Sequence, residues 1–306
     1  MKRIISLVLV FMVCSSHDLF IKLDSYFLTA DTDVELALFN GTFNKSDNVI
    51  TRDRMLDVSI IGNASRIQVD SSQWSDLDST TSVLHFKTGS SATYLAGVST
   101  KARNIAMEAS DFNDYLEHDG VLDVLEQRKE SGTLDQNALE KYSKHVKAVF
   151  QAGDKLTDDW KTILDYPIEF VPKVNPYALA VGDEMEVQLL RNGEPLSNQL
   201  VYAGFENEEH THSSDHDHGD HSHDEQQGRT DENGNASFTL DHSGLWYIRT
   251  IHLVETNEDS LTHESNWATL SFEIKAASSS GNISMVLILS LLVLAFALIY
   301  FRKMFQ

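Results

Sequence analysis

GDEMEVQLLRNGEPL, residues 182–196, carries the clearest secondary-structure signal in this 306-residue chain. Apolar and polar side chains alternate along it, in the order Met185, Glu186, Val187, Gln188 and Leu189. A period of two is typical of a strand with one buried face. Asn192-Gly193 follows, a pair that favours the tightest hairpin turns because both residues tolerate positive φ. The segment therefore predicts an antiparallel strand that enters a sharp turn.

Runs of the same kind occur on both sides of this segment. They cover residues 34–39, 56–61, 82–87, 92–99, 103–108, 168–173, 199–205, 236–240, 245–254 and 267–274. Each is short and bounded by turn-forming residues, as in antiparallel sheets. We expect a mostly β protein with two antiparallel β-sandwich domains, in residues 17–110 and residues 166–276. The second has the strand number of an immunoglobulin-like or transthyretin-like sandwich.

Between the two β regions the apolar period changes to that of a helix. Residues 110–119 place apolar side chains three or four positions apart, and Gly120 ends that pattern. Residues 121–130 and residues 134–151 repeat it. We therefore expect a helical insert over residues 111–165.

The beginning and the end of the chain both have the composition of membrane-targeting segments. Residues 1–16 start with Lys2 and Arg3, continue as an apolar run and end with small residues, which predicts a secretory signal peptide cleaved after Ser16. Residues 283–301 are almost uninterrupted apolar residues. As a helix this run would be about 28 Å long, which is enough to cross the hydrocarbon core of a membrane.

The residues around this expected transmembrane helix give its orientation. A short polar spacer, residues 277–282, precedes the helix, and Arg302-Lys303 begin the tail, residues 302–306. Positive charges of this kind remain in the cytoplasm. We expect a single-pass protein of the cell membrane, with an extracytoplasmic (periplasmic) N-terminal part and a cytoplasmic C-terminus.

Acidic residues dominate the chain between these two segments. Two of the 24 Lys and Arg residues lie in the signal and two follow the anchor, which leaves 20 against 46 Asp and Glu and a net charge of −26. Such a field attracts cations and repels nucleic acid and anionic lipid. The single cysteine, Cys14, lies in the signal, so the processed chain has no disulfide and no thiolate ligand.

Six histidines fall within fourteen residues: His210, His212, His216, His218, His221 and His223. We call residues 209–224 the histidine-rich segment and expect it to be one long loop between two strands. Neutral imidazole is a common ligand of divalent transition metals, and histidine-rich tracts are typical of metal binding. The spacing allows two or more imidazoles on one ion of nickel, cobalt, zinc or copper, without selecting among them. The alternative is a solvated acidic loop with no ligand.

Two further histidines are candidates for an ordered metal site. Cleavage of the signal makes His17 the first residue, with both an imidazole and an α-amine to offer a metal. His252 lies on the expected strand of residues 245–254, where packing is the alternative role. His263 and Glu264 lie in an expected loop from which they could reach the same site.

No motif of a known catalytic class is present. The sequence lacks a zinc-protease H-E-x-x-H, a nucleophile elbow, a phosphate-binding glycine loop and a cysteine nucleophile. We expect a binding protein and not an enzyme. The enzymatic alternative is a copper ion held by His17 and a second ordered histidine, for oxidative cleavage of polysaccharides.

Several short segments have a familiar order along the chain: His17-Asp18-Leu19-Phe20, residues 111–116, 140–144, 171–177, 182–183, 193–196 and 230–234, and Gly244-Leu245-Trp246. Together they resemble the extracytoplasmic, substrate-specific family of nickel and cobalt uptake (NikM-like proteins). The resemblance covers nearly the whole region between signal and anchor. It implies two β domains, often a histidine-rich loop, a C-terminal anchor, ligation by His17 and His252, and delivery of nickel or cobalt to a membrane permease.

Three hypotheses follow for the function. In the first, the protein captures a divalent metal, nickel or cobalt above others, for an uptake permease. In the second, it buffers or sequesters zinc or copper without a transporter. In the third, the sandwich is an adhesion or scaffold module and the histidine-rich segment is incidental.

Overall fold

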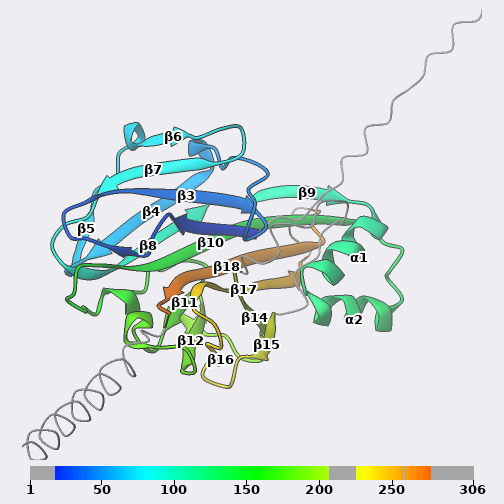
Figure 1. Cartoon of the computed structure of the whole chain (residues 1–306). Helices are drawn as coiled ribbons and strands as arrows, with labels where there is room; N and C mark the ends of the chain where they lie inside the picture. The colour runs from blue at the N-terminus through cyan, green and yellow to red at the C-terminus, as the bar shows by residue number, and fades with distance from the viewer. Residues whose placement is uncertain (1–17, 207–224, 257, 259, 277–306) are drawn as a thin grey trace, which may run out of the picture.

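The computed structural model of the protein describes residues 18–206, 225–256, 258 and 260–276. Its strands form three layers, in which a central sheet of ten strands has a four-stranded sheet packed on each face (Figure 1). The prediction of a mostly β protein is confirmed, and the stacked sheets agree with a sandwich arrangement.

The first outer sheet contains, in spatial order, β1 (Asp18–Leu23), β3 (Asp33–Gly41), β7 (Ser82–Lys87) and β6 (Trp74–Asp76). The central sheet contains β15 (Gln226–Arg229), β14 (Leu200–Phe205), β17 (Gly244–Glu255), β18 (His263–Ile274), β10 (Ala138–Ala152), β8 (Ala92–Thr100), β4 (Met55–Gly62) and β5 (Ser65–Ile67). Two further strands pair with β10, namely β2 (Phe27–Leu28) and β9 (Arg103–Met107). The second outer sheet contains β11 (Ile168–Pro172), β12 (Glu184–Arg191), β13 (Glu194–Pro195) and β16 (Asn235–Thr239). Short 3-10 helices connect some of these strands: η1 (Arg52–Arg54), η2 (Ser71–Gln73), η3 (Asp159–Lys161) and η4 (Pro176–Ala178).

The hairpin predicted from residues 182–196 is confirmed. The chain leaves β12, turns through Asn192 (φ 49°) and Gly193 (φ 81°), and returns as β13. Positive φ at both positions is what this turn requires, and an asparagine followed by a glycine meets that requirement at little cost. The apolar face of β12 is fully buried against the central sheet, through Met185, Val187 and Leu189.

The helix predicted over residues 134–151 is wrong, because this segment forms β10. The strand is parallel to β18 and antiparallel to β8 and β9. Val146 and Phe150 pack in the core beneath the first outer sheet, whereas Val149 packs in the core on the opposite face. Because both faces of β10 are buried, its apolar residues do not alternate with polar ones, and the pairing energy of the sheet overrides a spacing that resembled a helix.

The central sheet combines strands from both expected β regions. β4, β5 and β8 come from residues 17–110, while β14, β15, β17 and β18 come from residues 166–276. One apolar core fills the space beneath the first outer sheet and another the space beneath the second. The two regions are therefore built on one shared sheet, with β10 at its centre, and not on two separate sandwiches.

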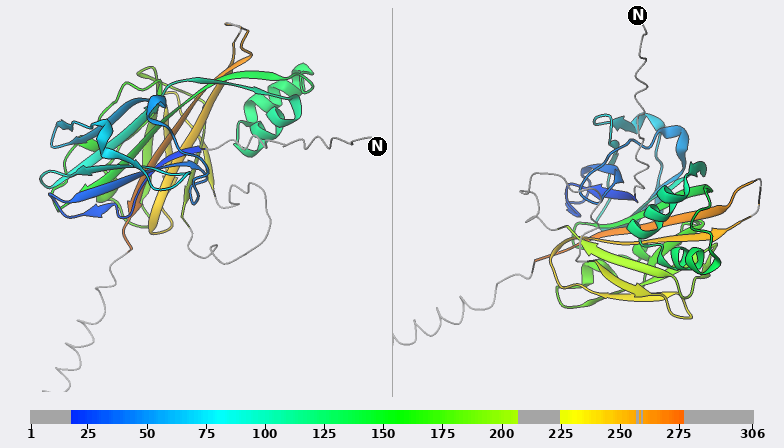
Figure 2. Two further views of the ribbon diagram at one scale, coloured as in Figure 1. Left: turned by 90° about the horizontal axis from the view of Figure 1, so that it is seen from above. Right: turned by 90° about the vertical axis from the view of Figure 1, so that its right-hand side faces the viewer.

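Two helices, α1 (Ala109–His118) and α2 (Leu122–Ser131), form the helical part of the expected insert, which is shorter than residues 111–165. They lie at one end of the molecule, beyond the sheets (Figure 2). Phe112, Leu116 and Leu125 pack there against side chains of β9, β10, β17 and β18. Gly132 ends α2 in the left-handed conformation, at φ 69°, as a glycine at this position is expected to do.

The signal peptide over residues 1–16 and the transmembrane helix over residues 283–301 lie outside the described residues and stay predictions, as do the spacer and the tail. Within residues 18–276, as far as they are described, no helix combines the length and the apolar composition needed to cross a membrane.

Candidate functional site at the start of strand β1

Strand β1, which starts one residue after His17, is an edge strand held by side chains of the central sheet. The hydroxyl of Thr269 donates a hydrogen bond to the Leu19 carbonyl at 2.7 Å, and that of Ser271 donates to the Ile21 carbonyl at 2.6 Å. These carbonyls alternate along the strand and face away from β3. The bonds satisfy an otherwise open strand edge and fix where β1 begins.

A buried guanidinium, that of Arg249 on β17, lies beside the first residue of β1. Its Nε is 3.7 Å from Asp18 Oδ2, and its Nη2 donates to Glu225 Oε2 at 2.7 Å. Its Nη1 donates to the backbone carbonyl of Asp119 at 3.0 Å. Burial opposes the charge, but Asp18 and Glu225 outweigh burial and raise the pKa of Arg249. Arg249 therefore remains charged and joins three segments that are far apart in the sequence.

The described residues on either side of the histidine-rich segment both reach this region. Before the segment, Glu206 pairs with Lys22 of β1 at 3.0 Å. After it, Glu225 binds Arg249 and also accepts a hydrogen bond from the Tyr247 hydroxyl at 2.7 Å. The nearest described residues on the two sides of the segment, Glu206 and Glu225, are thus attached at β1 or beside its first residue.

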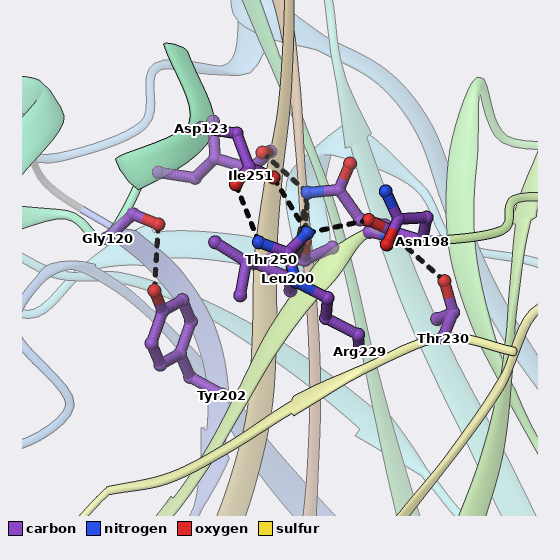
Figure 3. Close-up of polar contacts among 10 residues, drawn as sticks. Gly120, Asp123, Asn198, Leu200, Tyr202, Arg229, Thr230, Thr250 and Ile251 are labelled. Carbon is purple, nitrogen blue, oxygen red and sulfur yellow. Dashed lines mark hydrogen bonds and ion pairs between the residues drawn. The ribbon is translucent and has the colours of Figure 1, made fainter. Parts of the chain in front are cut away.

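The turn between α1 and α2 is attached to β14 and β15, the strands before and after the histidine-rich segment in the sequence. Figure 3 shows the Tyr202 hydroxyl donating to the Gly120 carbonyl, at 2.8 Å, and the Arg229 guanidinium pairing with Asp123, at 2.6 Å. Arg229 also donates to the Asn198 carbonyl at 2.9 Å (Figure 3). Asp119 directly precedes Gly120, so these bonds also keep the Asp119 carbonyl close to Arg249.

Asp18, Glu225 and Arg249 form a buried ionic cluster. This cluster extends to β10 through Lys144, whose charge interacts with Asp18. Its Nζ donates to Asn40 Oδ1 at 2.8 Å and lies 5.1 Å from the centre of the Trp267 ring. The side chain is only 5% exposed. Burial lowers the pKa of Lys144 to about 8, although the nearby carboxylates, Asp18 first, oppose that shift.

Glu140, four residues earlier on the same strand, is the acidic neighbour of Lys144. It is 2% exposed and accepts hydrogen bonds from the hydroxyls of Ser265 and Tyr115. Burial raises the pKa of Glu140 to about 7, and the two hydrogen bonds reduce that shift. Glu140 therefore changes charge close to neutral pH, at a position next to the cluster.

We expect the substitution Glu140→Gln to remove a pH-dependent loss of stability. The pKa of Glu140 in the folded protein, about 7, exceeds the ordinary 4.5. The stability that the protonated carboxyl contributes is therefore complete below pH 4.5 and is lost as the pH rises through 7. As the pH rises from 4.5 to 8, the free energy of unfolding of the variant should therefore increase by about 3 kcal/mol relative to that of the wild type. Urea unfolding at the two pH values measures this difference. Glu117→Gln, on the exposed face of α1, is the control, and a gap between wild type and Glu140→Gln that stays constant with pH would refute the assignment.

His252, a predicted ligand, lies on the other face of β17 from Arg249. His252 is three positions after Arg249, with two residues between them, so the alternation of the strand directs the two side chains to opposite sides. Its Nδ1 is 2.9 Å from Gln199 Oε1, and the Nε2 of that amide donates to Thr250. The imidazole Nδ1 is therefore the donor and Nε2 carries the lone pair. Burial, followed by the charge of Arg191, lowers the pKa of His252 to about 4.

His252 therefore does not lie at the start of β1. His263 was expected in a loop, but it is the first residue of β18, is buried, and packs 4.7 Å from the Phe112 ring. His17 and the six histidines of the histidine-rich segment lie outside the described residues. Among the residues that are described, no group of three or more His, Cys, Asp or Glu side chains is arranged to hold a metal ion.

The sequence patterns did not reveal the charged side chains of the cluster. Arg249 stands in a strand that otherwise reads as apolar, and Glu140 and Lys144 stand in the segment expected to be a helix. A signal was nevertheless present, because Asp18 and the residue pair of β10 belong to segments that carried the family resemblance. Two of those segments, distant in sequence, meet at this cluster.

The molecule is therefore a mostly β protein with several stacked sheets and a buried ionic cluster at the start of its first strand. It belongs to the family of a domain of unknown function (DUF4198), whose model matches residues 14–254. This match covers most of the chain and both segments that meet at the cluster.

The other comparisons give much weaker likenesses. The D0–D1 domain of intimin shares 13% identity at a TM-score of 0.19, covering 84% of this chain and 97% of that one. The adhesin InvE of Yersinia pseudotuberculosis shares 12% identity at a TM-score of 0.21, covering 83% of this chain and 58% of that one. Scores this low support no inference about fold or function. A search among curated proteins finds no significant match.

Proposed function

We propose that the protein is a membrane-anchored, extracytoplasmic binding protein for a divalent transition metal, which it captures for an uptake permease. Nickel and cobalt are favoured by the resemblance of the motifs to uptake proteins, with zinc or copper buffering as the second candidate. The histidine-rich segment collects the ion, and His17, with its imidazole and α-amine, receives it.

The contact between Glu225 and Arg249 carries this proposal. Glu225 directly follows the histidine-rich segment, and Arg249 lies 3.7 Å from Asp18, the residue after His17. Glu225 and Asp18 are thus held by the same guanidinium. Because these two residues are the sequence neighbours of the segment and of His17, we propose that the ion passes from the segment to His17 at this place. The charge of −26 on the processed chain adds a field that concentrates cations.

Titration of the purified, detergent-solubilised chain with Ni²⁺, Co²⁺, Zn²⁺ and Cu²⁺ at pH 7.5 and pH 5 tests the proposal. A protonated imidazole does not ligate, so each histidine ligand with an ordinary pKa of 6.5 should reduce affinity about 30-fold at pH 5. Equal affinities at the two pH values would exclude histidine ligation. Tighter binding of zinc and copper alone, beyond the usual order of metal affinities, would favour the buffering function.

A further inference from the structure

A cavity of about 410 Å³ opens beside the ionic cluster, at the end of the molecule near β9 and β10. This volume is within the range of pockets for small molecules. Its charged lining consists of Arg54, Arg103, Lys144 and Glu140. Three cationic side chains and one carboxyl are an unusual lining in a chain with 46 acidic and 24 basic residues.

Arg54, the last residue of η1, is the least satisfied of these cations. Its side chain is buried, with 7% exposure, and its Nε has no hydrogen-bond partner. Its other contacts are long, at 3.5 Å to the Tyr142 hydroxyl and 3.4 Å to the Lys101 carbonyl. Within the described part of the chain, no carboxylate forms an ion pair with Arg54. A buried guanidinium without a carboxylate is costly unless a ligand supplies one.

Arg54 and Lys144 face the cavity close enough to repel each other. After burial, the charge of Arg54 is among the causes that lower the pKa of Lys144. An anion placed between them would relieve this repulsion. The fork of a guanidinium matches the two oxygens of a carboxylate, which favours a carboxylate over a spherical anion.

The remaining wall of the cavity has a polar part, formed by Asn40, Asn48 and Thr51, and an apolar and aromatic part. Met107 and Trp267 are both buried, and the Tyr142 ring lies 5.4 Å from the Arg54 guanidinium. Such a wall suits an apolar or aromatic body better than a hydrated inorganic ion. We infer that this cavity binds a small organic carboxylate, with its carboxylate between Arg54 and Lys144 and its body against Met107 and Trp267. The inference does not depend on metal binding.

Benzoate is the probe for this site, with neutral benzamide and inorganic phosphate as comparisons, and the full chain in metal-free buffer as the protein. Benzoate should quench or shift tryptophan fluorescence saturably and raise the melting temperature, whereas benzamide and phosphate should do neither. Arg54→Gln should weaken benzoate binding at least about tenfold, because a charge-assisted hydrogen-bond pair is lost. Arg52→Gln is the matched control, since Arg52 belongs to the same η1 but pairs with Asp76 outside the cavity lining.

Met107→Trp provides a second variant that fills the cavity without changing its charge, in case Arg54→Gln does not fold. It should also abolish the benzoate response. The inference is overturned if benzoate does not bind the wild type, or if either variant binds it with the wild-type constant. It is equally overturned if benzamide or phosphate binds as well as benzoate does.

Discussion

Arg249→Met should lower the free energy of unfolding by about 3–5 kcal/mol. The substitution keeps much of the side-chain volume but removes the charge that Glu225 and Asp18 face. Arg249 is 2% exposed, and the side chains of Asp18 and Glu225 are 2% and 9% exposed, so water does little to compensate. The backbone carbonyl of Asp119 also loses its donor. Urea unfolding at pH 7.5, followed by circular dichroism, measures the loss.

Arg229→Met is the matched control for this prediction. Its guanidinium pairs with Asp123 with similar geometry, at 2.6 Å, but the two side chains are 40% and 59% exposed. Exposed pairs of this kind contribute only about 0–1 kcal/mol. The double variant Arg249→Met with Glu225→Gln should recover part of the stability, because it removes one of the stranded carboxylates. Equal effects of the two single arginine variants would contradict a buried ionic cluster at the start of β1.

Exchange of all six histidines of the histidine-rich segment for asparagine should remove about one to two bound metal ions per chain. Four-coordinate sites use about four ligands each, so six imidazoles with the interspersed aspartates suffice for that number. The neighbouring acidic residues remain, so the overall charge hardly changes and the loss reports ligation rather than attraction. Equilibrium dialysis against Ni²⁺ at pH 7.5 counts the ions.

The control for the six-histidine variant replaces His85, His118 and His242 by asparagine. These three histidines are exposed on the described surface and lie outside the segment. Their replacement should leave the number of bound ions unchanged. If the six-histidine variant binds as many ions as the wild type, the segment does not bind the metal. That result would support the hypothesis of an adhesion or scaffold module.

Local periodicity was sufficient for most of the strands. The alternation in β12 and the Asn192-Gly193 turn have a single physical cause each, which acts within a few residues. β10 differed because both of its faces are buried. Lys147 illustrates this, since a lysine reads as a solvent-exposed residue, yet it is 1% exposed and pairs with Glu169 at 2.8 Å. No local pattern in β10 predicts that Lys147 pairs with a residue 22 positions further along the chain.

Local sequence patterns do not predict the ionic cluster, for the same reason. Asp18, Asp119, Glu225 and Arg249 come from four separate segments, and only the pairing of β14, β17 and β18 brings them together. His252 shows the converse limit. Its strand was correctly predicted, but its site depended on which face of β17 meets β1, and that is a property of the packed sheets.

Calorimetric titration of the six-histidine variant with Ni²⁺, with and without the additional change His17→Ala, tests the central claim most directly. Mass spectrometry first establishes that both chains begin at residue 17. We predict one tight site in the six-histidine variant that is lost, by at least about 100-fold in affinity, when His17 is replaced, because both the imidazole and its chelate ring with the α-amine disappear. A tight site that persists after His17→Ala, or the absence of any tight site once the six histidines are gone, would contradict metal transfer to the start of β1.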